Sequence, residues 1–125
     1  MSRFLTPLCV AMTNRKYNGR DLWRLSSDFI YQSRIAGLIT VPNGFLTDFA
    51  SVPRLPVVFW LTGDTAHRAA VIHDWLYKTG LKPRDIADRV LLEAMKVARM
   101  PLWRRQSMYL AVRLFGARNY HGRAK

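Results

Sequence analysis

The sequence contains a single cysteine, few acidic residues and no long apolar run. Because Cys9 has no second cysteine to pair with, nothing in the chain requires an oxidising compartment. The apolar run at residues 57–61 is far shorter than the roughly 20 residues that a membrane-spanning helix needs. The first ten residues are interrupted by Pro7, which is not typical of a signal peptide. We therefore expect a protein that is made and folded in a cytoplasm.

The shortage of acidic residues leaves the chain strongly basic. It has 20 Lys and Arg against 8 Asp and Glu, which gives a net charge of +12, and no acidic residue follows Glu93. Such a surface favours an anionic partner, such as nucleic acid, lipid headgroups or an acidic protein patch. The alternative is a solvated basic face that only improves solubility.

The length and patterning indicate one domain over residues 1–125, mainly strands in 1–50 and mainly helices in 51–125. Alternating or β-branched segments at residues 8–12, 22–31 and 35–41 are separated by turn residues such as Asn18-Gly19. We predict that these segments form a small N-terminal antiparallel sheet.

The second half of the sequence predicts helices. A short one follows Ser51 within residues 51–60, and three longer ones cover residues 65–79, 83–99 and 101–116. Asp64 is placed to cap the first of the three, and Gly80 is placed to end it. The short connection at residues 80–82 turns the first two into an antiparallel αα-hairpin. The chain is therefore predicted to be α+β, with a three-helix C-terminal part.

A candidate catalytic site lies on this hairpin. Small alanines share one helical stripe with His73 and Tyr77, so the second helix can come close and bring Asp88 opposite them. A histidine that gives one ring nitrogen to a carboxylate keeps the other as a base or ligand. We predict catalytic roles for His73, Asp88 and Tyr77. The alternative is a buried His–Asp pair that is purely structural.

Further acidic residues border this region. Asp74 points to its edge, and His67 shares the face of Asp74, so the two form a conceivable metal pair. Asp48 either caps the following helix or projects toward His73.

Five arginines form the candidate contact with an anionic partner. They lie in the third long helix and its two flanks, among Trp103, Tyr109 and Tyr120, which is typical of a phosphate-contacting surface. The five are Arg99, Arg104, Arg105, Arg113 and Arg118.

Several segments together resemble one known family. They are residues 45–53, 69–77, 87–88, 94–95 and 109–116, in this order along the chain. The family comprises small proteins of tailed phages and prophages and is catalogued as a domain of unknown function. The resemblance implies a phage or prophage origin, with synthesis in the host cytoplasm, other phage proteins as partners and incorporation into the virion as one destination.

The pattern His73-Asp74-x-x-Tyr77, followed by Asp88 on a partner helix, is similar to the helix pair of secreted and parvoviral phospholipases A2. The resemblance implies that His73 activates water, Asp74 binds calcium, and Asp88 orients His73 with a bond from Tyr77. Asp48 would be the further candidate ligand of a divalent cation such as calcium. The chain departs from that family because it lacks the glycine-rich calcium loop before the histidine helix and the disulfide framework.

Three functions are compatible with these observations. We favour a virion or assembly component, associated with the tail or with DNA delivery, in which the His–Asp hairpin is a scaffold. The alternatives are a hydrolase that uses His73, Asp74 and Asp88 on a lipid or peptidoglycan of the envelope, and a nucleic-acid-binding protein. An exposed His73 would favour the hydrolase, and a sealed one would favour the scaffold.

Overall fold

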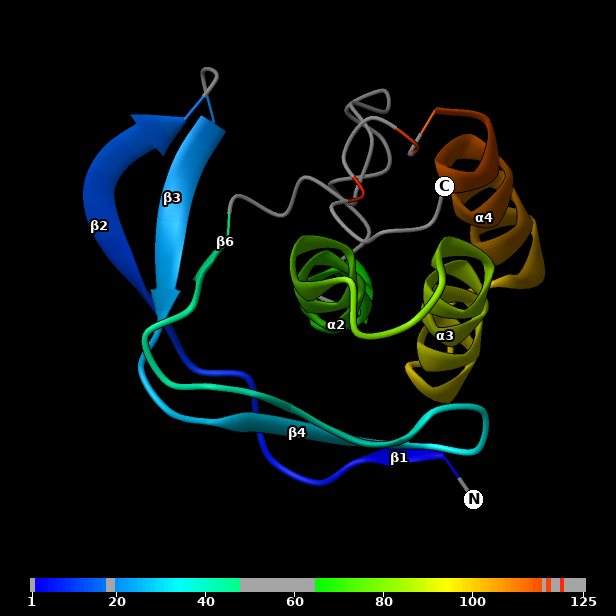
Figure 1. The fold of residues 1–125 in the computed structure, drawn as a ribbon, viewed down its shortest axis with the longest axis horizontal. Coiled ribbons are helices and arrows are strands. Elements are labelled where there is room, and N and C mark those ends of the chain that lie inside the picture. The colour runs from blue at the N-terminus through cyan, green and yellow to red at the C-terminus, as the bar shows by residue number, and fades with distance from the viewer. Residues whose placement is uncertain (1, 18–19, 48–64, 116, 118–119, 121–125) are drawn as a thin grey trace.

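The computed structural model describes residues 2–17, 20–47, 65–115, 117 and 120, and in these it is an α+β structure with strands first and helices after (Figure 1). This confirms the predicted fold class. The strands are β1 (Arg3–Phe4), β2 (Val10–Tyr17), β3 (Arg20–Leu25), β4 (Phe29–Ser33), β5 (Gly37–Val41) and β6 (Leu46–Thr47). The helices are α2 (Thr65–Thr79), α3 (Arg84–Val97) and α4 (Leu102–Phe115).

The predicted N-terminal sheet is present as two antiparallel sheets of three strands, ordered β1-β4-β5 and β2-β3-β6. The prediction of one continuous strand over residues 22–31 is wrong, because the chain bends at residues 26–28 and passes from one sheet to the other. At this bend the Ser26 N–H donates to the Cys9 carbonyl at 2.9 Å. Strands β1 and β6 have two residues each, too short to give a periodic signal in the sequence.

The three long helices occupy the predicted segments to within two residues. Helix α2 ends at Thr79, just before Gly80, whose φ of +64° is accessible to glycine at little cost and whose N–H donates to the Leu76 carbonyl at 3.0 Å. The connection that follows brings α3 back against α2, as the hairpin prediction requires. The predicted short helix within 51–60 and the Asp64 cap lie outside the described residues.

The core lies between the helices and the β1-β4-β5 sheet, which runs beneath α2 and α3 in Figure 1. Phe29, Tyr31 and Val41 face it from alternate positions of β4 and β5, and none of their surface is exposed. The helices contribute fully buried alanines, such as Ala70 and Ala87, which leave room for close packing between α2 and α3. This close packing brings together the side chains of α2 and α3 that face each other.

None of the helices in the described ranges combines the length and the apolar character needed to cross a membrane.

Candidate functional site

The hairpin brings His73 of α2 and Asp88 of α3 into direct contact. The His73 Nε2 lies 2.6 Å from Asp88 Oδ1, and both residues are completely buried. Tyr77, one helical turn after His73, donates its hydroxyl to the same carboxylate oxygen at 2.5 Å. The predicted contact between His73, Tyr77 and Asp88 is therefore confirmed.

The second oxygen of Asp88 is held by arginine. Arg113 of α4 donates from Nη1 to Oδ2 at 2.7 Å, and the Nε of Arg84 lies 3.9 Å from the same oxygen. Burial by itself would raise the pKa of Asp88, but the hydrogen bonds from His73, Tyr77 and Arg113 outweigh it and hold that pKa below its ordinary value. Asp88 is therefore ionised at neutral pH.

Arg84 extends this network to the end of α4. Its Nε donates to the Tyr77 hydroxyl at 3.2 Å, and its Nη2 donates to the carbonyls of Val112 and Arg113 at 2.7 and 2.8 Å. A cation beside the last carbonyls of a helix is favourable because these carbonyls have no partners within the helix. Burial and the adjacent Asp88 carboxylate raise the pKa of Tyr77 well above its ordinary value, so its hydroxyl keeps the proton that it donates. The network thus joins all three helices around Asp88.

The other ring nitrogen of His73 has no such partner. Because an ionised carboxylate only accepts hydrogen bonds, the Nε2 of His73 carries the hydrogen that Asp88 accepts. In the neutral imidazole the lone pair is then on Nδ1. This atom is buried and has no hydrogen-bond partner in the part of the chain that the structure describes. The site therefore presents a base whose tautomer is fixed.

Two observations on His73 favour different roles. Its complete burial favours a scaffold, because a sealed side chain does not meet a substrate. Its Nδ1 favours chemistry, because a buried polar atom without a partner costs about 1–3 kcal/mol, and an apolar side chain would fill the same place without that cost. A scaffold alone does not account for the second observation.

The calcium ligands implied by the phospholipase resemblance are not assembled by the described residues. Asp74 is 4% exposed, and its Oδ2 accepts the Thr47 hydroxyl at 2.7 Å and lies 3.9 Å from the Lys78 ammonium. Within the described ranges no three His, Cys, Asp or Glu side chains, His67 included, gather as a metal site. Asp48 lies outside those ranges. Because a neighbouring ammonium opposes a divalent cation, the described surroundings of Asp74 do not fit calcium.

Comparison with known proteins places the chain in a family. The family described as "Protein of unknown function (DUF1353)" matches residues 23–112. The chain belongs to this family. The matched part of this DUF1353 protein contains His73, Tyr77, Arg84 and Asp88, whereas Arg113 lies one residue beyond it.

One curated relative is similar over most of the chain. The uncharacterized protein y4jT of Sinorhizobium fredii (strain NBRC 101917 / NGR234) is 31% identical over an alignment of 102 residues that covers 78% of this chain. The chain spans only 30% of the length of that relative. No solved structure matches the chain.

The arginines predicted to contact an anionic partner do not form one surface in this DUF1353 protein. Arg104 is buried, with 4% of its surface exposed, and Arg113 is bound to Asp88. Arg99 is exposed at the end of α3, and Arg105 lines a groove on the outer side of α3. Arg118 lies outside the described residues. Two of the four described arginines are therefore directed inward.

Sequence reasoning missed the two cations of the Asp88 network. Arg84 lies four residues before Asp88, a spacing that places oppositely charged side chains on one helix face and was available in the sequence. Arg113 was identified as a cation but was assigned to the surface. Its true partner depends on how α4 packs, which no spacing along the chain reveals.

Proposed function

We propose that this DUF1353 protein is a hydrolase in which His73 activates water, and that it acts on an envelope component, an ester or amide of a lipid or of peptidoglycan. The observation that carries this proposal is the Nδ1 of His73, to which no described residue supplies a partner, on a ring whose other nitrogen is fixed by Asp88. The resemblance of the chain to tailed-phage proteins supports a role in a phage or prophage.

The reaction follows from the fixed tautomer. The Nδ1 of His73 accepts a proton from water while the water oxygen attacks the carbonyl carbon, and the resulting imidazolium returns that proton to the leaving group. The ionised Asp88 stabilises the imidazolium through Nε2–H, at 2.6 Å. A positioned base of this kind contributes about 10²–10⁴-fold to a rate.

Tyr77 and Arg113 act through Asp88 in this mechanism. Their hydrogen bonds, of 2.5 and 2.7 Å, hold the carboxylate in place and keep it ionised, so that it orients His73 and does not take its proton. Because His73 is completely buried, a substrate reaches Nδ1 only after a local opening of the structure.

A hydrolysis assay on purified variants tests the proposal. Phospholipid vesicles and peptidoglycan are incubated with the wild type, His73→Ala and Asp88→Asn, and released fatty acid or soluble fragments are measured. We expect release by the wild type to fall by about 100-fold or more in His73→Ala, without loss of helical circular dichroism. The matched control is His67→Ala, at the half-buried histidine of the same helix, which keeps its rate. Equal rates for wild type and His73→Ala would overturn the proposal.

A second candidate is a virion or assembly component in which the same network is a scaffold. It is favoured by the complete burial of His73 and Asp88 and by the bonds that join three helices there. In this case His73→Ala and Asp88→Asn unfold the protein and abolish phage assembly together. Loss of infectivity by a variant that still folds and assembles favours the hydrolase instead.

A further inference from the structure

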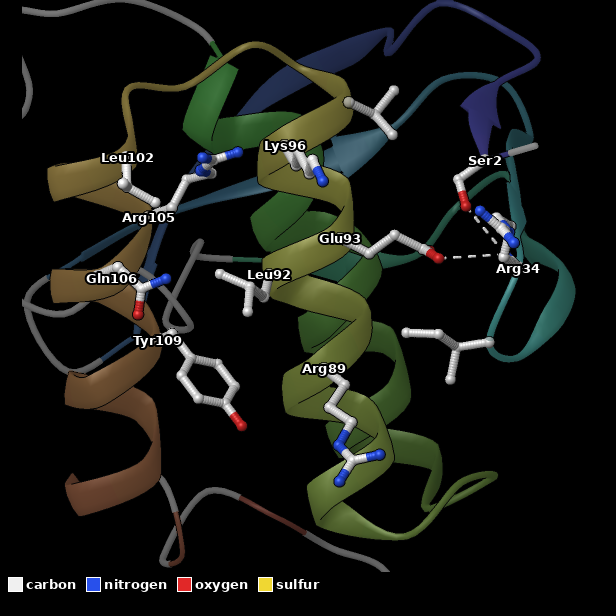
Figure 2. Close-up of a pocket in the computed structure, with 12 residues that line it drawn as sticks. Ser2, Arg34, Arg89, Leu92, Glu93, Lys96, Leu102, Arg105, Gln106 and Tyr109 are labelled. Carbon is white, nitrogen blue, oxygen red and sulfur yellow. Dashed lines mark hydrogen bonds between the residues drawn. The ribbon is translucent and has the colours of Figure 1, made fainter.

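A broad groove lies on the outer side of α3, facing away from α2. It has a volume of about 1170 Å³, larger than most small-molecule sites, and it extends from α4 across α3 to the turn between β4 and β5 (Figure 2). Four cationic side chains from these three elements line it, namely Arg34, Arg89, Lys96 and Arg105. We call the groove and the solvent-facing side of α4 together the outer face.

The described residues supply few acidic side chains to neutralise the positive charge of the outer face. Glu93 is the single acidic side chain in the groove lining, and its oxygens accept the Tyr31 hydroxyl at 2.7 Å and the Arg34 backbone N–H at 3.2 Å. None of the four groove cations forms an ion pair with another described residue. The Nε of Arg105 is buried, and no described residue supplies it with an acceptor. The groove thus carries positive charge that the described residues do not neutralise.

Apolar side chains project from α4 beside these cations. Leu102, Trp103, Leu110 and Leu114 are each 58–63% exposed. Residues 103, 110 and 114 fall within about 40° of one another at 100° per residue, and Leu102 also lines the groove. Large apolar side chains gathered on one face of a protein mark a contact with a partner or a membrane.

We infer that the outer face docks on the surface of an anionic phospholipid bilayer. Leucine and tryptophan side chains enter the boundary between headgroups and acyl chains, while lysine and arginine contact the phosphates. This inference goes beyond the proposed hydrolase and does not depend on it, because the His73–Asp88 pair lies between α2 and the inner side of α3.

Charge and polarity disfavour other occupants. A second copy of the chain would bring another net charge of +12 against the four cations. A nucleic acid would satisfy the cations but leave the exposed leucines against phosphate and water. A bilayer of anionic lipid matches both the charged and the apolar parts of the outer face.

Vesicle flotation tests the inference. We expect the full chain to float with phosphatidylglycerol vesicles, to stay behind with neutral phosphatidylcholine vesicles, and to dissociate as salt rises. The triple variant Arg89→Gln, Lys96→Gln and Arg105→Gln lowers the partition coefficient by about 100-fold, at roughly five-fold per cation. The double variant Leu110→Ser and Leu114→Ser lowers it by about ten-fold or more.

The matched control is Met12→Ser combined with Arg15→Gln on β2. Met12 is 60% exposed, Arg15 is also exposed, and β2 lies at the opposite end of the molecule from α4 in Figure 1. This variant keeps wild-type partitioning, and soluble glycerol phosphate does not compete, because a headgroup alone lacks the apolar contact.

Three results would overturn the inference: equal binding to neutral and anionic vesicles, wild-type binding by the triple variant, or capture of an acidic protein by a chain that binds no vesicle. His73→Ala keeps vesicle binding, so failure of the hydrolase proposal and failure of this inference are distinguishable.

Discussion

Asp88 and Arg89 are neighbours on α3, yet they lie in opposite electrostatic environments. Asp88 faces α2, has no exposed surface and accepts hydrogen bonds from side chains of α2 and α4. Arg89 faces outward and is exposed, in a groove whose four cations have one carboxylate among them. The charge of Asp88 on the inner side of α3 is neutralised by its partners, whereas no described residue forms an ion pair with the cations on the outer side.

The difference shows why net charge by itself was a poor guide to function. Arg84 and Arg113 bind groups inside the protein, in the network around Asp88, although a count of charges assigns both to the surface. Cations that form no ion pair with another described residue, such as Lys96 and Arg105, are the ones available to an outside anion. Charged side chains that neutralise one another position groups within the protein. Cations without such partners are free to bind an anionic partner from outside.

Removing the Asp88 carboxylate is the strongest test of the difference between the two sides of α3. Asp88→Ala leaves His73, Tyr77 and Arg113 without their shared acceptor, and we expect the free energy of unfolding to fall by about 3–5 kcal/mol. Arg89→Ala, one residue along the same helix, is the matched control and should change it by no more than about 0.5 kcal/mol. Urea denaturation followed by circular dichroism measures both. Similar losses in the two variants would contradict the distinction between the sides of α3.

The pH dependence of stability is a second test of the environment of Asp88. Burial opposes ionisation of Asp88, but its hydrogen bonds prevail and place its pKa in the folded state below the ordinary 3.8. Its contribution to stability is therefore complete above about pH 4 and is lost as the pH falls through the folded value, because the unfolded state then binds more protons. The free energy of unfolding should fall less steeply below pH 4 in Asp88→Asn than in the wild type. Identical slopes would show that Asp88 is not held ionised.

The sequence was sufficient for features that depend on neighbours along the chain. The 3.6-residue pattern and the short connection after Gly80 located α2 and α3, and the same pattern placed His73 and Tyr77 against Asp88. It was not sufficient for features that depend on how distant elements meet. Whether residues 22–31 stay in one sheet, and whether Arg113 turns inward, is decided by packing between elements far apart in sequence.

Tyr77→Phe tests a single bond of the inner network. The variant removes one of the donors to Asp88 and the acceptor of the Arg84 Nε, while it keeps the ring that packs at 4.0 Å from His73. We expect a loss of about 1–2 kcal/mol in the free energy of unfolding. Tyr109→Phe, at the half-buried tyrosine of the outer groove, is the control and leaves it nearly unchanged. If the Tyr77→Phe effect persists undiminished in an Asp88→Asn background, it does not come from this bond.

The smallest expected effect is a gain in stability, at the exposed end of α3. Arg99 has a φ of +64°, a conformation that costs a non-glycine residue about 1–2 kcal/mol, and the Met100 N–H behind it closes the helix by donating to the Met95 carbonyl at 3.0 Å. Arg99→Gly should therefore raise the free energy of unfolding by up to about 1 kcal/mol, because glycine adopts this φ without strain. Arg89→Gly should lower it by about 1 kcal/mol, since glycine weakens a helix interior. Thermal unfolding of the two variants distinguishes the cases, and the same sign for both would refute the strain at Arg99.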